Sequence, residues 1–230
     1  MGTENYWDID LGDLGDMDLN LDDITGEDKS LIVSTKTIPS KMIKYENAEK
    51  LAERCDLSKQ DRFDCIVKGD FIFGDFLFAL FVKYGIHTKE LTISTLSMNL
   101  DNIYKLRMLI EWGAIDKIRI LASIYFYANE RNHLIKALFD NIPPEKLECA
   151  FVDVHTKIIT FETDGGKKIV ISGSANLRSS GCTENFIIEN NAQAFDFYNG
   201  YHNDFFNIVK IRKKNVLRNT VTNKMLFCKD

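Results

Sequence analysis

Apolar and polar positions along the chain predict strands and helices in turn. Residues 90–98 and 117–127 are short, β-branched-rich apolar runs typical of strands, and the intervening 102–112 has helical spacing and ends at Gly113. Further helices are expected over 41–60, 71–84, 132–139 and 192–209, and further strands over 147–163 and 167–176. Alternation of this kind is typical of an α/β domain with a largely parallel sheet covered by helices.

The most apolar segment is 71–84, which reads FIFGDFLFALFVKY. It predicts a buried helix that begins near Gly74 or Asp75, with Gly85 as its C-cap. Neither this segment nor any other apolar run reaches the ~18–20 residues that a membrane-spanning helix needs. We therefore expect no membrane partner.

We expect three parts in the chain: an acidic, disordered tail over 1–30, a folded domain over 31–215 and a short tail over 216–230. Residues 1–30 hold ten of the 34 acidic side chains and only one of the 29 basic ones. The remainder therefore has 28 basic and 24 acidic residues, a net charge of +4, although the whole chain carries −5. The tail could be a solubilising segment, could dock on a protein partner, or could mask a phosphate-binding groove.

The start of the chain lacks the basic-then-apolar order of a signal peptide, so a cytoplasmic location is expected. The five cysteines are odd in number, and none forms a CxxC pair. This pattern argues against both a disulfide framework and a zinc site. With no metal-binding or nucleotide-loop motif on the folded part, we expect neither metal nor cofactor.

The strongest chemical signal is His155-Thr156-Lys157, followed by Gly173-Ser174-Ala175-Asn176 beyond a turn at residues 164–166. A strand would place His155 and Lys157 on one face, because strand side chains alternate with a period of two. A two-residue turn, at either 164–165 or 165–166, would bring Ser174 and Asn176 to the same face. A three-residue loop would turn them to the other face.

These groups suit metal-independent attack on a phosphodiester. Neutral imidazole can attack phosphorus to give a phosphohistidine, which makes His155 the candidate nucleophile. Charge on the phosphoryl oxygens can be held by the ammonium of Lys157, the amide of Asn176 and the hydroxyl of Ser174. Gly173 lets the backbone approach closely.

The pattern His155-x-Lys157-x4-Glu162, then Gly173-Ser174-x-Asn176, resembles the H-x-K-x4-D and G-S-x-N motifs of the phospholipase D superfamily. The resemblance implies a mixed sheet flanked by helices, with the motif on a β-hairpin. It also implies phosphodiesterase chemistry without a metal.

The chain departs from this family at two supporting positions. Glu162 stands where the family usually has Asp, and Ile187 replaces the Glu of an Asn-x-Glu that would begin at Asn185. Glu184 and Glu189 lie nearby in the sequence, and either could orient His155.

The single motif supplies only one histidine, whereas the leaving alkoxide needs a second acid. A second His-Thr-Lys, at His87, lacks a following Gly-Ser-x-Asn and is interpreted as a polar loop. The resemblance implies a homodimer in which two copies of His155 face each other. His133 and His202 are interpreted as structural.

The sequence therefore predicts an endonuclease-like phosphodiesterase acting on nucleic acid, DNA in preference to RNA. A basic C-terminal stretch favours a phosphate backbone; it comprises Lys210, Arg212, Lys213 and Lys214. The alternative is a nucleic-acid-binding or scaffolding module that keeps the fold but has little activity.

Overall fold

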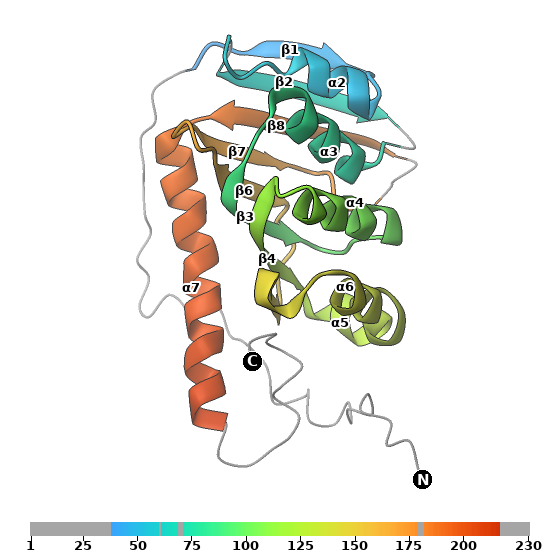
Figure 1. The fold of residues 1–230 in the computed structure, drawn as a ribbon, viewed down its shortest axis with the longest axis vertical. Coiled ribbons are helices and arrows are strands. Elements are labelled where there is room, and N and C mark those ends of the chain that lie inside the picture. Colours follow the sequence, from blue (N-terminus) through green and yellow to red (C-terminus); the bar gives the residue numbers. More distant parts are fainter. Residues whose placement is uncertain (1–37, 60, 69–70, 179–181, 217–230) are drawn as a thin grey trace.

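The computed structural model describes residues 38–59, 61–68, 71–178 and 182–216, with side chains to residue 207. An eight-stranded sheet forms the centre, in the order β1-β2-β8-β7-β6-β3-β4-β5. The helices α2 to α6 lie along one face and the long helix α7 crosses the other (Figure 1). The predicted tail over 1–30 and residues 217–230 lie outside the described residues.

The strands are β1 (Lys41–Lys44), β2 (Arg62–Lys68), β3 (Thr88–Thr95), β4 (Ile115–Ser123), β5 (Leu147–Val152), β6 (Ile158–Glu162), β7 (Lys168–Gly173) and β8 (Thr183–Asn190). The α-helices are α2 (Ala48–Arg54), α3 (Phe73–Tyr84), α4 (Leu100–Glu111), α5 (Ile124–Glu130), α6 (Lys136–Asn141) and α7 (Ala192–Val216). A π-helical turn, Arg131–Ile135, joins α5 to α6, and a 3-10 turn, Pro144–Lys146, precedes β5.

The sheet is mixed, with two parallel flanks joined by an antiparallel centre. Strands β1 and β2 run parallel at one flank, and β3, β4 and β5 run parallel at the other. Between them, β8, β7 and β6 pair antiparallel with each other and with both flanks. A mixed α/β sheet flanked by helices was expected, but the expectation of a largely parallel sheet is wrong for the centre.

The main core lies between the sheet and α2 to α6. The apolar segment expected to be a buried helix forms α3, and Gly85 ends it in the left-handed conformation with φ of 56°. Phe73 and Phe76 pack against Phe186 of β8 at ring-centroid distances of 5.1 and 5.2 Å. Phe81 packs against Phe161 of β6 at 5.0 Å. Aromatic burial on this scale makes α3 the helix that anchors the antiparallel centre.

A smaller core and a buried charged group lie beneath α7. Phe205 and Phe206 pack with apolar residues of β4 and β5. Arg119 is buried there, with its guanidinium 4.1 Å from the ring centre of Phe206 and 3.5 Å from the carboxylate of Glu148. Lys117 binds the same carboxylate at 2.7 Å. Pairing of this kind offsets the cost of burying the charges.

Three sequence predictions differ from the observed elements. The segment 41–60 holds strand β1 before helix α2, and the strand predicted over 117–127 ends at Ser123, where α5 begins. The strand predicted over 147–163 is two strands, β5 and β6, separated by residues 153–157. Strands β1, β2 and β8 were not predicted.

The β6–β7 hairpin forms as expected, but with a three-residue loop. Glu162 pairs with Lys168, and the Thr163 N–H donates to the Lys167 carbonyl at 3.0 Å, which leaves residues 164–166 in the loop. Gly166 takes φ of 75° there. Both two-residue turns are therefore wrong, and the register places Lys157 opposite Gly173 rather than opposite Ser174.

Across the described residues, no helix combines the length and apolar character needed to cross a bilayer.

Candidate active site

The motif residues lie at one edge of the sheet, where β3, β4 and β5 end and β6 begins. His155 and Lys157 belong to the connection from β5 to β6 and not to a strand. Because β5 is an outer strand and β6 is central, this connection crosses the ends of β4 and β3. It thus lies outside the carboxyl ends of parallel strands, the usual place for a ligand in α/β sheets.

His155 and Lys157 contact each other directly. The Nζ of Lys157 lies 3.0 Å from the Nδ1 of His155 and 2.8 Å from the His155 carbonyl oxygen. His155 is exposed, whereas Lys157 is half-buried. Burial lowers the pKa of Lys157, and the nearby carboxylate of Glu184 partly counteracts this shift. The pair therefore presents an imidazole to solvent beside a partly desolvated ammonium.

Gly173 brings the second half of the motif against this pair. Its N–H donates to the Lys157 carbonyl at 3.2 Å, which extends the β6–β7 pairing by one step. A Cβ at this position would lie 2.2 Å from the Asn185 carbonyl oxygen and 2.6 Å from the Phe186 Cα. The glycine is therefore needed for the close approach of β8, a neighbour that the sequence did not predict.

Ser174 is held by β8. Its hydroxyl donates to the carboxylate of Glu184 and accepts from the Asn185 N–H at 3.0 Å. The Ser174 N–H donates to the Asn185 carbonyl at 2.8 Å. The hydroxyl proton is thus directed to Glu184 rather than towards the open side of the site. Glu184 links both halves of the motif, because its carboxylate binds Ser174 and also acts on Lys157.

Asn176 is fixed by the segment that follows β3. Its side-chain oxygen accepts from the Leu96 N–H at 3.3 Å. Its amide NH₂ has no acceptor among the described residues, so its donors are free for a ligand. Next to it, the Leu177 N–H donates to the Thr95 hydroxyl at 3.3 Å. These contacts tie the Gly-Ser-x-Asn segment to the end of β3.

Four hydroxyl groups, which sequence reasoning missed, support the site. Thr156 donates to Ser94 at 3.0 Å and lies 3.0 Å from the Tyr201 hydroxyl on α7. Thr95 anchors the other half of the motif, as described above. Only the position of Thr156 between the two motif residues could have signalled its role, because Ser94 and Tyr201 are far away in sequence.

Two supporting residues are not beside His155. Glu189 lies near the opposite end of β8, where its carboxylate is 3.7 Å from Arg62 and 3.3 Å from the Asn191 amide. Its suggested orienting role is wrong, since five residues of extended strand, ~16 Å, separate it from Glu184. Glu162 ends β6, also at the edge opposite His155. Asn185 lies in the site, through its backbone pairing with Ser174.

The basic stretch at Lys210, Arg212, Lys213 and Lys214 falls in the final turns of α7, beyond the side chains that the structure describes.

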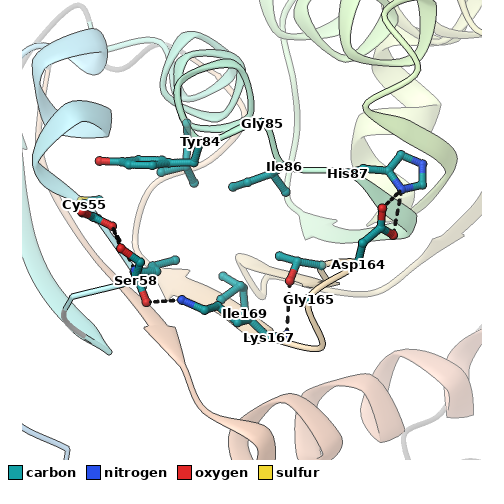
Figure 2. Close-up of a pocket in the computed structure, with 14 residues that line it drawn as sticks. Cys55, Ser58, Tyr84, Gly85, Ile86, His87, Asp164, Gly165, Lys167 and Ile169 are labelled. Carbon is teal, nitrogen blue, oxygen red and sulfur yellow. Dashed lines mark hydrogen bonds and ion pairs between the residues drawn. The ribbon is translucent and has the colours of Figure 1, made fainter.

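The second His-Thr-Lys lies at the opposite edge of the sheet. The Nδ1 of His87 is 2.9 Å from both carboxylate oxygens of Asp164 in the hairpin loop, and its Nε2 is 3.3 Å from Asp116. Hydrogen bonds to these two carboxylates raise the pKa of His87. Figure 2 shows His87 turned towards Asp164 at one end of a cavity of about 290 Å³, whose far wall includes Cys55 and Tyr84. His87 is therefore separate from the candidate active site.

The remaining histidines have different surroundings. His202 belongs to α7 and is fully buried against the sheet, with its Nδ1 3.5 Å from the Thr160 hydroxyl of β6. Burial, assisted by the charge of Arg119, lowers the pKa of His202 to about 3, so it is neutral near pH 7. His133 is exposed on the π-helical turn, 3.7 Å from Glu130. Neither contacts the candidate active site.

The space inside the site is too small for a substrate. A cavity of about 10 Å³ lies under Lys157, lined also by Gly173, Ala175 and Thr95. That volume is at the lower limit for a single water molecule. A substrate must therefore approach from the exposed side of His155. Within the described part of the chain, no group of three or more His, Cys, Asp or Glu side chains has the geometry of a metal site.

Comparison with known proteins gives matches in structure alone. No protein-family model matches the sequence, and no curated protein does. Among solved structures, the chain is similar to NucT from Helicobacter pylori, with 16% identity, a TM-score of 0.42 and coverage of 53% of this chain and 80% of NucT. It is also similar to the phospholipase D family member Nuc from Salmonella typhimurium, with 14% identity, a TM-score of 0.41 and the same coverages. Polyphosphate kinase from Porphyromonas gingivalis matches with 14% identity and a TM-score of 0.48, over 66% of this chain and 28% of the kinase. These similarities concern the fold alone.

Proposed function

We propose that the protein is a metal-independent phosphodiesterase that cleaves nucleic acid, DNA in preference to RNA, through a phosphohistidine on His155. The observation that carries the proposal is the contact between His155 and Lys157 at the edge of the sheet, together with Asn176, which is held at the end of the neighbouring strand β3 with its amide donors free. An exposed imidazole next to fixed positive and amide donors suits attack on a phosphodiester and stabilisation of its charge.

The contact also bears on the tautomer of His155. An ammonium group only donates hydrogen bonds, so the Nδ1 that it contacts accepts, and a neutral His155 carries its proton on Nε2. Attack through Nε2 requires that proton to move to Nδ1. We propose that a bound phosphate draws the Lys157 ammonium to its own oxygens, which frees Nδ1 to take the proton.

The reaction then proceeds in two balanced steps. The His155 nitrogen forms a bond to phosphorus while the bond from phosphorus to the leaving oxygen breaks, and that oxygen takes a proton from a second acid. Water then attacks the phosphorus and gives a proton to the second acid, which restores it, while the bond from phosphorus to the His155 nitrogen breaks and returns the free imidazole. Among the described residues no other histidine lies at the site, so we propose the His155 of a second copy as the acid, in a twofold homodimer.

The proposal is tested by incubating the protein with plasmid DNA, single-stranded DNA and RNA in excess EDTA. His155→Ala is compared with His133→Ala, which removes an exposed histidine away from the site. We expect cleavage by the wild type and by His133→Ala, and none by His155→Ala. Cleavage that EDTA abolishes would refute the histidine mechanism.

The homodimer is tested by sedimentation over a range of concentrations. We expect a dimer whose dissociation on dilution is accompanied by loss of activity. A monomer that is fully active at every concentration would refute the shared site.

A second candidate is a nucleic-acid-binding module with little activity. It is favoured by the contacts of His155: no carboxylate among the described residues holds its imidazole, and Lys157 occupies Nδ1. The same experiment separates the two candidates. Binding of the oligonucleotides without cleavage, by both the wild type and His155→Ala, would support the module.

A further inference from the structure

A polar groove lies at the same edge of the sheet, beyond β8, where β1 and β2 end. It encloses about 460 Å³ and is lined by Tyr45, Asn47, Glu49, Lys68, Phe71 and Asp75, among others. This volume is in the range of small-ligand sites. The groove is not part of the candidate active site, and the proposed chemistry does not use it.

The strand register places the groove next to the candidate active site. Lys68, the last residue of β2, pairs with Thr183, and the preceding Val67 pairs with Glu184. Glu184 in turn binds the Ser174 hydroxyl. Three strand spacings, ~14 Å in total, separate the end of β2 from the start of β6. One extended polymer can therefore contact both places.

Tyr45 presents an aromatic ring in a strained backbone conformation. It is the one non-glycine residue with positive φ in the described part of the chain, at 57°. Its N–H donates to the Ile66 carbonyl at 2.7 Å, which holds this conformation. Its side chain is 63% exposed. Backbone strain that surrounding contacts maintain at an exposed aromatic residue points to a binding role.

The groove is lined by one basic residue, Lys68, and by three acidic residues, of which Glu46 forms an ion pair with Arg54 at 2.9 Å. Lys68 is exposed and has no carboxylate partner among the described residues. The carboxylate of Asp75 forms an ion pair with Lys105 at 3.0 Å, whereas that of Glu49 has no basic partner among the described residues. A phosphate is therefore favoured at Lys68. Glu49, which is also exposed, can accept hydrogen bonds from the amino groups of a base.

We propose that this groove binds one unpaired nucleotide of a single-stranded polynucleotide, with its base stacked on Tyr45 and its phosphate at Lys68. The inference rests on the proposed function, because it places the neighbouring phosphates of the same strand at His155. A base held in a duplex cannot enter, since its face is stacked and its edge is paired. The groove thus selects single strands.

The test measures binding of a mixed-sequence single-stranded oligonucleotide and of its duplex to proteins carrying His155→Ala, which prevents turnover. Tyr45→Gly removes the ring, and it suits the positive φ, so the backbone gains no strain. We expect this change to weaken single-strand binding by about 5- to 100-fold and to leave duplex binding unchanged. Tyr45→Phe should bind like the parent, as should Trp112→Ala, which removes an equally exposed ring away from the groove.

Lys68→Gln tests the phosphate contact. For single strands, loss of one such contact should reduce the slope of log affinity against log salt by about 0.7. Lys89→Gln removes an exposed lysine at the opposite edge, at the start of β3, and should not alter the slope. Unchanged single-strand affinity in Tyr45→Gly, or an equal loss on the duplex, would overturn the proposal.

Cleavage by the wild type in EDTA is measured separately. If it is absent while Tyr45→Gly loses single-strand affinity, the groove stands and the phosphodiesterase fails. If cleavage is present while Tyr45→Gly binds normally, the enzyme stands and the groove fails.

Discussion

The hydroxyl of Ser174 donates a hydrogen bond to the carboxylate of Glu184. This contact joins the Gly-Ser-x-Asn segment to β8, and the same carboxylate acts on the Lys157 ammonium. Glu184 therefore acts on the two halves of the motif together, although it does not contact His155. Its predicted supporting role is retained as a proposal, with Lys157 and Ser174 as the groups through which it acts.

Glu184→Gln should move the alkaline limb of the cleavage profile to lower pH. Burial already lowers the pKa of Lys157, and the Glu184 carboxylate opposes that shift, so its loss lowers the pKa further. The ammonium is then lost earlier as pH rises. Initial rates measured across pH would show the shift, with Glu162→Gln at the far end of β6 as the control. An unmoved alkaline limb would show that the carboxylate does not act on Lys157.

Gly173→Ala should destabilise the fold by about 1–3 kcal/mol or more, because the added Cβ meets the backbone of Asn185 and Phe186. Denaturant unfolding measures the loss. The matched control is Gly200→Ala in α7, where a Cβ meets nothing within 4 Å. There we expect a gain of about 0.5–1 kcal/mol, since alanine is the better helix former. Equal stability of the two variants would contradict the close approach of β8.

His202→Phe should make the protein less sensitive to acid. The folded-state pKa of His202 is about 3, below the ordinary 6.5 of an unfolded histidine, so the unfolded state binds the proton more readily. The stability that this difference provides is complete above pH 6.5. It is lost as pH falls towards 3, by a total on the order of 5 kcal/mol.

The measurement for His202 is the free energy of unfolding at several pH values, taken as wild type minus variant so that carboxylate titrations cancel. The difference should change steadily below pH 6.5. His133→Phe, at an exposed position, serves as the control and should run parallel to the wild type.

His87→Ala should leave cleavage unchanged, because the second His-Thr-Lys lies at the opposite edge of the sheet, bound to Asp164 and Asp116. The rate of plasmid cleavage measures this. A loss comparable with that of His155→Ala, in a variant that keeps its fold by circular dichroism, would show that His87 takes part in the reaction.

Deletion of residues 1–30 should strengthen binding to nucleic acid. It removes ten acidic residues and one basic residue, and the rest of the chain then carries a net charge of +4. Reduced repulsion should be most evident at low salt. Titration of full-length and shortened protein against one oligonucleotide measures the change. Equal affinities would favour the solubilising or partner-docking interpretations of this segment.

The sequence predicted the elements with strong local patterns. Helix α3 and its Gly85 cap were predictable because a long apolar run ends at a residue that accepts the left-handed conformation. The hairpin was predictable because glycines separate two apolar runs. Strand β8 was missed because its sequence, TENFIIEN, is polar at both ends, and only its neighbours β2 and β7 make it a central strand.

The site was predicted by residue type, but its geometry was not. Loop length at residues 164–166 determines the face of every later residue in the hairpin, and the local sequence permits two or three residues equally. His155 and Lys157 lie next to each other because their segment leaves β5 to cross the ends of two strands. That path depends on strand order, which sequence separations do not reveal.

The antiparallel centre of the sheet also has a consequence for local stability. Strands β6, β7 and β8 carry Gly173 and Glu184 and bind Lys157 and Ser174 of the candidate site, and they connect the two parallel flanks. Separation of these three strands would therefore dismantle the catalytic groups while the parallel strand pairings within each flank remain. Amide hydrogen exchange in β6, β7 and β8 should then correlate most closely with loss of activity. Both should occur before the whole domain unfolds cooperatively.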